Sequence, residues 1–443
     1  MAKKVKSAGE LDRISSLPDP ILCHILSFSP TKDAVRTSIL SRRWRYLFAS
    51  MPTLDFYSCL RDLPRRNVNN FWGFVDRLLF FPNRVSLECF RLHDPTSKDD
   101  DHLRLYDCIS AALWRGAKEI VIYSRNCPVF PTLLFTSQSL MVLKLNIEGE
   151  MKIPADVCLP NLKTLHLTNL VFVVGSSILR LISSCHVLED LVLDLCDFHN
   201  ISVLSIHSLS LKRLGLSFLE MVVGSPGDLN CAVEINTPNL VYLRCTELIA
   251  EGYTFSNMSS LEKAHISIYP VNRDATDNVD RIRGVTNLFQ AIRNVQDLSL
   301  FTDNAETLFG TCLEPGLAFP NLVELEFGNP NGDWKGTWIM EFLCCMPNLK
   351  KLILDLGVPE EGFRVVPEKV PSCVLFHLKE IEVPSFEGDK HMFAMISYLL
   401  NHGRVLEKLI IDVYDPCEER RLSLIEELLR LPRNSKKCDV EIL

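Results

Sequence analysis

The stretch PNLKTLHL, residues 160–167, decides the fold, because its pattern returns along the chain. The tripeptide Pro-Asn-Leu that opens it recurs at Pro238, Pro320 and Pro347. Each copy continues as L-x-x-L-x-L or a close variant, reading LKTLHL, LVYLRC, LVELEF and LKKLIL. A repeat of this kind predicts a stack of similar units and not a globular enzyme core. We therefore expect the chain to hold a partner along an extended surface.

Looser copies fill the gaps, giving twelve starts spaced 21 to 34 residues apart. Leucine-rich repeats have periods of roughly 20–29 residues, so only the longest spacing is well outside. Leucine-rich repeats often carry Asn or Cys at the ninth position of the motif, and here only Cys196 fits. The resemblance therefore predicts an irregular leucine-rich-repeat solenoid. The looser copies begin at Ala117, Leu140, Leu188, Leu211, Leu261, Val295, Leu378 and Leu406.

The repeat also predicts which side chains face inward. On a short strand the fourth and sixth motif positions point to one face, and the residues between them point to the other. One strand cannot bury its apolar side alone, so neighbouring strands should stack in parallel and share a core. The return path of each repeat needs a helix or an irregular segment. Residues 176–185 and 336–346 have apolar residues at helical spacing.

Composition sets further bounds on 443 residues with 47% hydrophobic content and a formal charge of −8. An acidic balance argues against a general nucleic-acid binder, and no apolar run approaches the length of a membrane span. The first residues carry lysines without a following apolar stretch, so they do not form a secretory signal. No Cys/His spacing suits zinc, and we expect Cys158, Cys185, Cys245 and Cys344 to be buried free thiols. No cofactor and no catalytic motif is indicated.

Residues 12–56 precede the repeats and predict three short helices. Asp19 and Pro20 mark the first start, and Pro30 ends that helix. Thr31 is expected to cap the second helix. Ser41 is expected to cap a third helix that carries Trp44. A module of this size has a small core and gains stability by docking on something.

This segment resembles an F-box of the plant type, through Leu17-Pro18-Asp19, residues 34–38, Leu40-Ser41-Arg42-Arg43-Trp44 and residues 52–56. In that family the module docks on a Skp-type adaptor, which links it to a cullin ubiquitin ligase. A plain helical cap for the solenoid would explain the apolar stripes but not the L-S-R-R-W run. Three arginines are too few for a nucleic-acid patch. The resemblance implies that the adaptor is bound by Leu17, Pro18, Ile21, Leu22, Ile25, Leu26, Val35, Leu40 and Trp44.

The C-terminal stretch resembles the FBD domain of plant F-box proteins. It is expected to contain a strand at residues 378–383, a helix at about 390–401 and the motif LEKLII at Leu406. A helix within residues 417–443 and a final strand at 438–443 would cap the stack. The expected organisation is a disordered tail (1–11), an F-box (12–58), a connecting helical region (59–115), leucine-rich repeats (116–370) and an FBD-like α/β cap (371–443).

The repeat pattern predicts an α/β protein. The resemblance to plant F-box proteins implies that it serves as a substrate-recognition subunit of an SCF-type (Skp-cullin-F-box) ubiquitin ligase. Such a subunit is not itself an enzyme, and it would act in the nucleus and/or cytoplasm, without nucleic acid or membrane. Two alternatives stay open: a small-molecule sensor, and a leucine-rich-repeat scaffold with no ligase link. Outward strand positions form a face of mixed charge, which suits a protein target, with basic residues in the middle and acidic residues later. The candidate target-binding residues are Arg213, Tyr242, Arg244, Lys263, Glu324 and Glu326.

Overall fold

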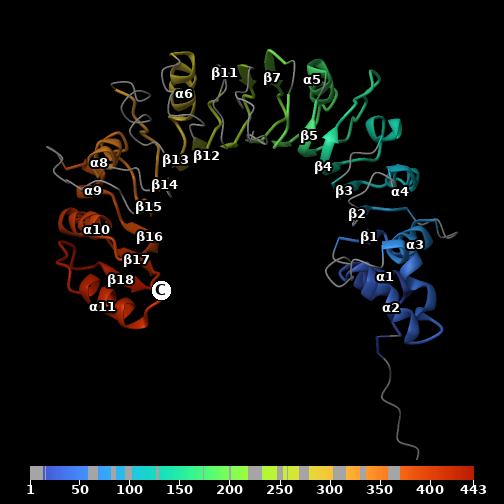
Figure 1. The fold of residues 1–443 in the computed structure, drawn as a ribbon, viewed down its shortest axis with the longest axis horizontal. Helices are drawn as coiled ribbons and strands as arrows, with labels where there is room; N and C mark the ends of the chain where they lie inside the picture. The colour runs from blue at the N-terminus through green and yellow to red at the C-terminus, as the bar shows by residue number, and fades with distance from the viewer. Residues whose placement is uncertain are drawn as a thin grey trace, which may run out of the picture. The chain divides into compact units, whose positions relative to one another are not determined.

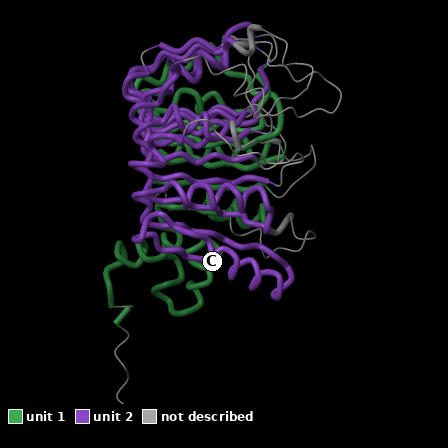
Figure 2. The backbone as a smooth tube through the Cα atoms, turned by 90° about the vertical axis from the view of Figure 1, so that its left-hand side faces the viewer, with its two compact units in different colours: residues 1–173, 184–188 green, residues 174–183, 189–443 purple. Residues whose placement is uncertain are grey.

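The structure is a computed structural model in which the chain forms two compact units, residues 1–173 with 184–188, and residues 174–183 with 189–443 (Figure 2). We call them unit 1 and unit 2. The structure describes residues 13–14, 16–57, 68–80, 86–94, 102–125, 129–172, 174–198, 201–217, 232–246, 253–256, 258–268, 279–302, 316–329, 336–357 and 370–443. The expected disordered tail, residues 1–11, lies outside these ranges.

Unit 1 begins with the predicted short helices, α1 (Asp19–Ser27) and α2 (Thr31–Arg36), followed by the 3₁₀ helices η1 (Thr37–Ile39) and η2 (Trp44–Ser50). Both expected caps are wrong. Pro30 takes the N-cap position of α2, and the buried Thr31 hydroxyl instead accepts a hydrogen bond from the Asp55 backbone N–H at 2.7 Å. The third helix starts after Arg43 and has no side-chain cap.

The repeats of unit 1 form five parallel strands. One face of this sheet carries α3 (Val68–Leu79), α4 (His102–Trp114) and η5 (Thr132–Phe135) (Figure 1). The strands are, in order, β1 (Thr53–Asp55), β2 (Cys89–His93), β3 (Glu119–Ser124), β4 (Val142–Glu150) and β5 (Thr164–Val171).

Unit 2 continues the same pattern, and each of its neighbouring strands pairs in parallel. Its helices are α5 (Gly175–Ser183), α6 (Val279–Ile292), α8 (Gly336–Cys344), α9 (Ser372–Phe376), α10 (Lys390–His402) and α11 (Glu418–Leu429). Its main sheet contains β6 (Asp190–Asp194), β8 (Arg213–Ser217), β10 (Tyr242–Thr246), β12 (Lys263–Ile268), β13 (Asp297–Thr302), β14 (Glu324–Asn329), β15 (Lys351–Leu356), β16 (Glu380–Phe386), β17 (Lys408–Val413) and β18 (Asp439–Ile442).

The predicted register is confirmed. All twelve repeat starts lead into a strand, β3 to β6, β8, β10 and β12 to β17, two residues further on. The fourth and sixth motif positions are buried, as in β15, where Leu352 and Leu354 are inaccessible while Lys351 and Ile353 are partly exposed. We call the side that the helices leave uncovered the open face of each unit.

The Asn of the Pro-Asn-Leu tripeptide has a structural role that the pattern did not reveal. Its side-chain amide donates to a backbone carbonyl of the preceding repeat in all four copies. Asn161 reaches Gln138 at 2.8 Å, and Asn348 reaches Pro320 at 2.8 Å. The other two pairs are Asn239 with Leu209 at 2.7 Å and Asn321 with Asn294 at 3.5 Å. In these four repeats the tripeptide therefore links the repeat to the preceding one by a hydrogen bond, and its leucine is buried in the core.

Two expectations about organisation need correction. The region 59–115 is not only a helical connection, because it contains β2, which pairs with β1 and β3, so the parallel sheet starts before residue 116. The return path also forms a second sheet in unit 2. It contains β7 (Val203–His207), β9 (Ala232–Asn236) and β11 (Tyr253–Ser256), all parallel, where we expected helices or irregular segments. Helix α5 packs near β7, and α6 packs against β11.

The C-terminal region follows its prediction closely. The expected strand, helix and LEKLII strand are β16, α10 and β17, and α11 precedes the final strand β18. Asp389 caps α10, because its carboxylate accepts from the backbone N–H groups of His391 at 3.0 Å and Met392 at 2.8 Å. Strand β18 is the last strand of the sheet and pairs with β17.

Candidate functional site

The N-terminal helices of unit 1 enclose a small core of their own. Leu22 and Leu26 of α1 pack with Ala34 of α2 and with Trp44 and Leu47 of η2. The Cys23 thiol also reaches the Leu47 carbonyl at 3.5 Å. The inward faces of α1, α2 and η2 therefore pack against one another within the module.

One arginine joins the two motifs that carried the F-box resemblance. The Arg43 guanidinium donates to the Asp19 carboxylate at 2.7 and 3.1 Å, and also to the Leu17 carbonyl. The L-P-D motif at the start of α1 is thus tied to the R-R-W motif at the start of η2. This ion pair is partly exposed, so it contributes geometry more than stability.

The outer face of α1 is mainly apolar, with His24 packed 4.9 Å from the Phe28 ring. Ile21, Ile25 and Phe28 follow helical spacing along one side, with exposed fractions of 47%, 43% and 78%. Three large apolar side chains next to one another are seldom left exposed to water. This face therefore indicates a docking surface. Further exposed apolar residues of the module are Ile14, Ile39, Leu40 and Tyr46.

The structure divides the nine predicted adaptor residues into supporting and surface positions. Leu22, Leu26 and Trp44 lie inside the module core, where they support the exposed positions. Leu17 and Val35 are half-buried, while Pro18, Ile21, Ile25 and Leu40 are exposed. The prediction did not include Phe28 and Ile39, which are also exposed and apolar. The spacing of Phe28, seven residues after Ile21, was the signal that could have found it.

The six candidate target residues lie together on the open face of unit 2, in two neighbouring rows of the sheet. Arg213, Tyr242 and Lys263 occupy successive register positions of the first row, and Glu324 follows after Asp297. Arg244 and Glu326 belong to the second row. All six are exposed or half-buried. The sequence therefore placed them on one surface correctly.

Their charges are already paired across the strands. Arg213 binds Asp190 at 2.9 Å, Lys263 binds Asp297 at 2.8 Å and Arg244 lies 3.7 Å from Asp194. The basic residues in the middle of this face are therefore matched by carboxylates on neighbouring strands. Exposed ion pairs of this kind contribute little to folding stability. They also reduce the net positive charge that a binding partner would meet at these residues.

The later strands keep an acidic excess around one lysine. Lys351 lies 3.3 to 3.5 Å from carboxylate oxygens of Glu324, Glu380 and Glu382. Partial burial works to lower the pKa of Lys351, but its hydrogen bond with Glu380 and the surrounding carboxylates outweigh burial and raise it. Lys351 therefore stays charged and links these strands through ion pairs. The later strands carry the acidic residues that the sequence predicted there.

The structure offers little for catalysis. Within the described ranges, no three His, Cys, Asp or Glu side chains are grouped so that they could hold a metal ion. No helix in this part of the chain has the length and apolarity to cross a bilayer. Burial raises the pKa of the Cys245 thiol to about 12 and that of Cys185 to about 11, so neither is a ready nucleophile. Cys158 and Cys344 are exposed, which corrects their expected burial.

Comparison with known proteins gives the class. Residues 14–55 match the F-box domain, and residues 85–438 match the family described as the At1g61320/AtMIF1 LRR domain. The chain therefore belongs to the plant F-box/LRR-repeat family. F-box domains in general bind Skp-type adaptors, and members of this family are typically non-catalytic subunits of ubiquitin ligases.

Several Arabidopsis thaliana proteins are similar over nearly their full length. F-box/LRR-repeat protein At3g59200 is 33% identical, and the alignment covers 98% of this chain and 88% of that protein. Putative F-box/FBD/LRR-repeat protein At3g59240 is 32% identical, with 98% and 89% covered. Putative FBD-associated F-box protein At5g53635 is 31% identical, with 96% and 99% covered.

Proposed function

We propose that this chain is a substrate-recognition subunit of an SCF-type ubiquitin ligase. The F-box binds a Skp-type adaptor and through it a cullin, and the open face of the repeats binds a target protein. The observation that carries the proposal is the outer face of α1. Ile21, Ile25 and Phe28 remain exposed on a module whose core is complete without them.

In this proposal the chain supplies binding and geometry, and a conjugating enzyme supplies the chemistry. The first repeat strand is tied to the F-box by the hydrogen bond from the Asp55 N–H to the Thr31 hydroxyl, and Phe56 is fully buried among Phe71, Phe74 and Phe90. The module is thus built onto the repeats of unit 1, and a target held there would have a defined position relative to the adaptor.

The target in this proposal is a protein. Cross-strand pairs of both signs cover the open face of unit 2, and such a surface suits the mixed charge of a protein and not a polyanion. As part of the same proposal, the chain works in the nucleus and/or cytoplasm, where reducing conditions keep thiols such as that of Cys158 reduced.

Proximity labelling in plant cells tests the proposal. Deleting the F-box would also remove β1, which lies within it. The comparison therefore uses the full chain and Ile21→Asp/Ile25→Asp, which alters only exposed positions. With the proteasome inhibited, both chains should label the same target. Without inhibition, that target should be depleted by the wild-type chain and should accumulate with the variant. A set of labelled proteins whose levels respond equally to both chains would contradict the proposal.

A further inference from the structure

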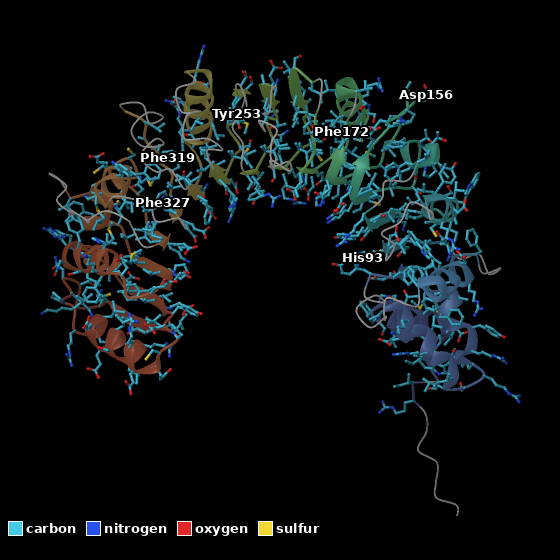
Figure 3. The ribbon with its side chains drawn as sticks, in the orientation of Figure 1. His93, Asp156, Phe172, Tyr253, Phe319 and Phe327 are labelled. Carbon is cyan, nitrogen blue, oxygen red and sulfur yellow. The ribbon has the colours of Figure 1, made fainter. Side chains whose placement is uncertain are left out.

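Three aromatic rings pack together on the open face of unit 1. Tyr57 follows β1, His93 ends β2, and Tyr123 of β3 is the register partner of His93. The ring centroids of Tyr57 and His93 are 5.5 Å apart and stacked, and Tyr123 lies 5.1 Å from Tyr57 and 6.0 Å from His93. Figure 3 shows His93 on the side of the strands that the helices leave open. Because each ring touches the other two, the cluster is held in one arrangement.

The aromatic cluster is accessible. Tyr57 is 42% exposed, and His93 and Tyr123 are half-buried. Aromatic side chains dominate the energetic centres of protein interfaces. Rings that are already fixed lose little conformational entropy when a partner covers them. The cluster is therefore a preformed apolar surface on a rigid part of the fold.

Two charged residues beside the aromatic cluster, Arg91 and Asp94, have partners within the chain, and Arg125 also acts on His93. Arg91 donates to Glu119 at 2.8 and 3.0 Å and lies 3.6 Å from Asp55. Burial lowers the pKa of His93, against the opposing effect of Asp94, so the imidazole is neutral at pH 7. Arg91 and Asp94 therefore need no charged partner. An apolar side chain would gain buried area and ring contacts.

We propose that the aromatic cluster of Tyr57, His93 and Tyr123 anchors the target, by taking an extended segment that presents an aromatic or long aliphatic side chain. This inference rests on the proposed function, whose target it describes. The cluster lies on the first strands after the F-box and in the same compact unit. A target anchored there is held beside the module that binds the adaptor.

Panning a library of random linear peptides against the full chain tests this proposal. The chain is used alone and with a Skp-type adaptor, and the enriched peptides are then synthesised and their Kd values measured. We expect the enriched peptides to share an aromatic or long aliphatic residue. Tyr57→Ser and Tyr57→Ser/Tyr123→Ser should weaken their binding by about tenfold or more, the loss typical of an interface hot spot.

Tyr414→Ser is the matched control, because Tyr414 is an exposed tyrosine (68%) of unit 2, and it should leave the Kd unchanged. If the double variant fails to fold, the Kd of the Tyr57→Ser single variant tests the proposal, because this change removes the most exposed ring. The proposal is overturned if no peptide is enriched, if the shared residues are only charged ones, or if both Tyr57 variants bind as the wild type does. Failure of the full chain to bind the adaptor would instead contradict the proposed function.

Discussion

Single side chains explain why the sequence motifs have their composition. Asn348 is the plainest case, because its amide joins two repeats through one hydrogen bond of 2.8 Å. Arg43 does the same between two motifs of the F-box. Thr31 illustrates the limit of local reasoning. A threonine before a helix predicts a cap. Here the Thr31 hydroxyl instead accepts a hydrogen bond from the backbone N–H of Asp55, 24 residues later in β1. The sequence around Thr31 does not predict that contact.

The buried thiols give a prediction at this scale. Burial raises the pKa of Cys108 and of Cys245 to about 12, so these thiols stay protonated and covered at pH 8. Iodoacetamide followed by peptide mass spectrometry should modify Cys158 and Cys344 in the folded chain and spare Cys108 and Cys245.

The raised pKa values of these buried thiols also predict how folding stability changes at alkaline pH. The folded chain keeps these protons while an unfolded chain loses them near pH 9, so folding stability should fall as pH rises from about 9 to 12. Labelling in denaturant is the control and should modify all four cysteines. Equal modification of Cys245 and Cys344 in the folded chain would contradict the assigned burial.

Elements were predicted well wherever the period of the apolar pattern was unambiguous. The L-x-x-L-x-L hexamers gave strand positions and the correct inward face, because alternation on a strand leaves only two choices. Strands β7, β9 and β11 were missed, since they share no motif and are only four or five residues long. Their pairing depends on non-local neighbours, which local patterns do not contain.

Strand β14 allows a direct test of the two faces. Leu325 is 1% exposed, whereas the next residue, Glu326, lies on the open face and accepts from Ser299 at 2.6 Å. Leu325→Ala should cost about 2–5 kcal/mol of unfolding free energy through lost burial and a cavity. Glu326→Gln should change it by about 0.5 kcal/mol or less.

Urea unfolding of both variants measures the difference. Because repeats are coupled mainly to their nearest neighbours, the loss caused by Leu325→Ala should be concentrated around β13–β15 in hydrogen exchange. A larger loss from Glu326→Gln than from Leu325→Ala would mean that the register of the open face is wrong by one residue.

At the scale of the whole molecule, the sequence predicted the order of modules but not where the repeats begin. Residues 51–56 (MPTLDF) and 87–92 (LECFRL) follow the repeat with Met or Phe in place of some leucines, and this substitution hid them. They lead into β1 and β2, where β2 pairs with β3 and β1 pairs with β2. The nine predicted adaptor residues were recognised as one motif. Only the folded module shows which of them lie in its core and which are exposed.

The central claim is that the exposed face of α1 binds a Skp-type adaptor. Calorimetric titration of purified adaptor into the full chain tests it most directly, with Ile21→Asp/Ile25→Asp as the variant. Leu422→Asp/Leu429→Asp is the control, because these residues are exposed to a similar extent (53% and 47%) on α11. Truncating an interface hot spot costs about 2 kcal/mol or more, so the α1 variant should lose adaptor binding almost completely while the control binds as the wild type does. Equal affinity of the wild type and a folded α1 variant would contradict the claim.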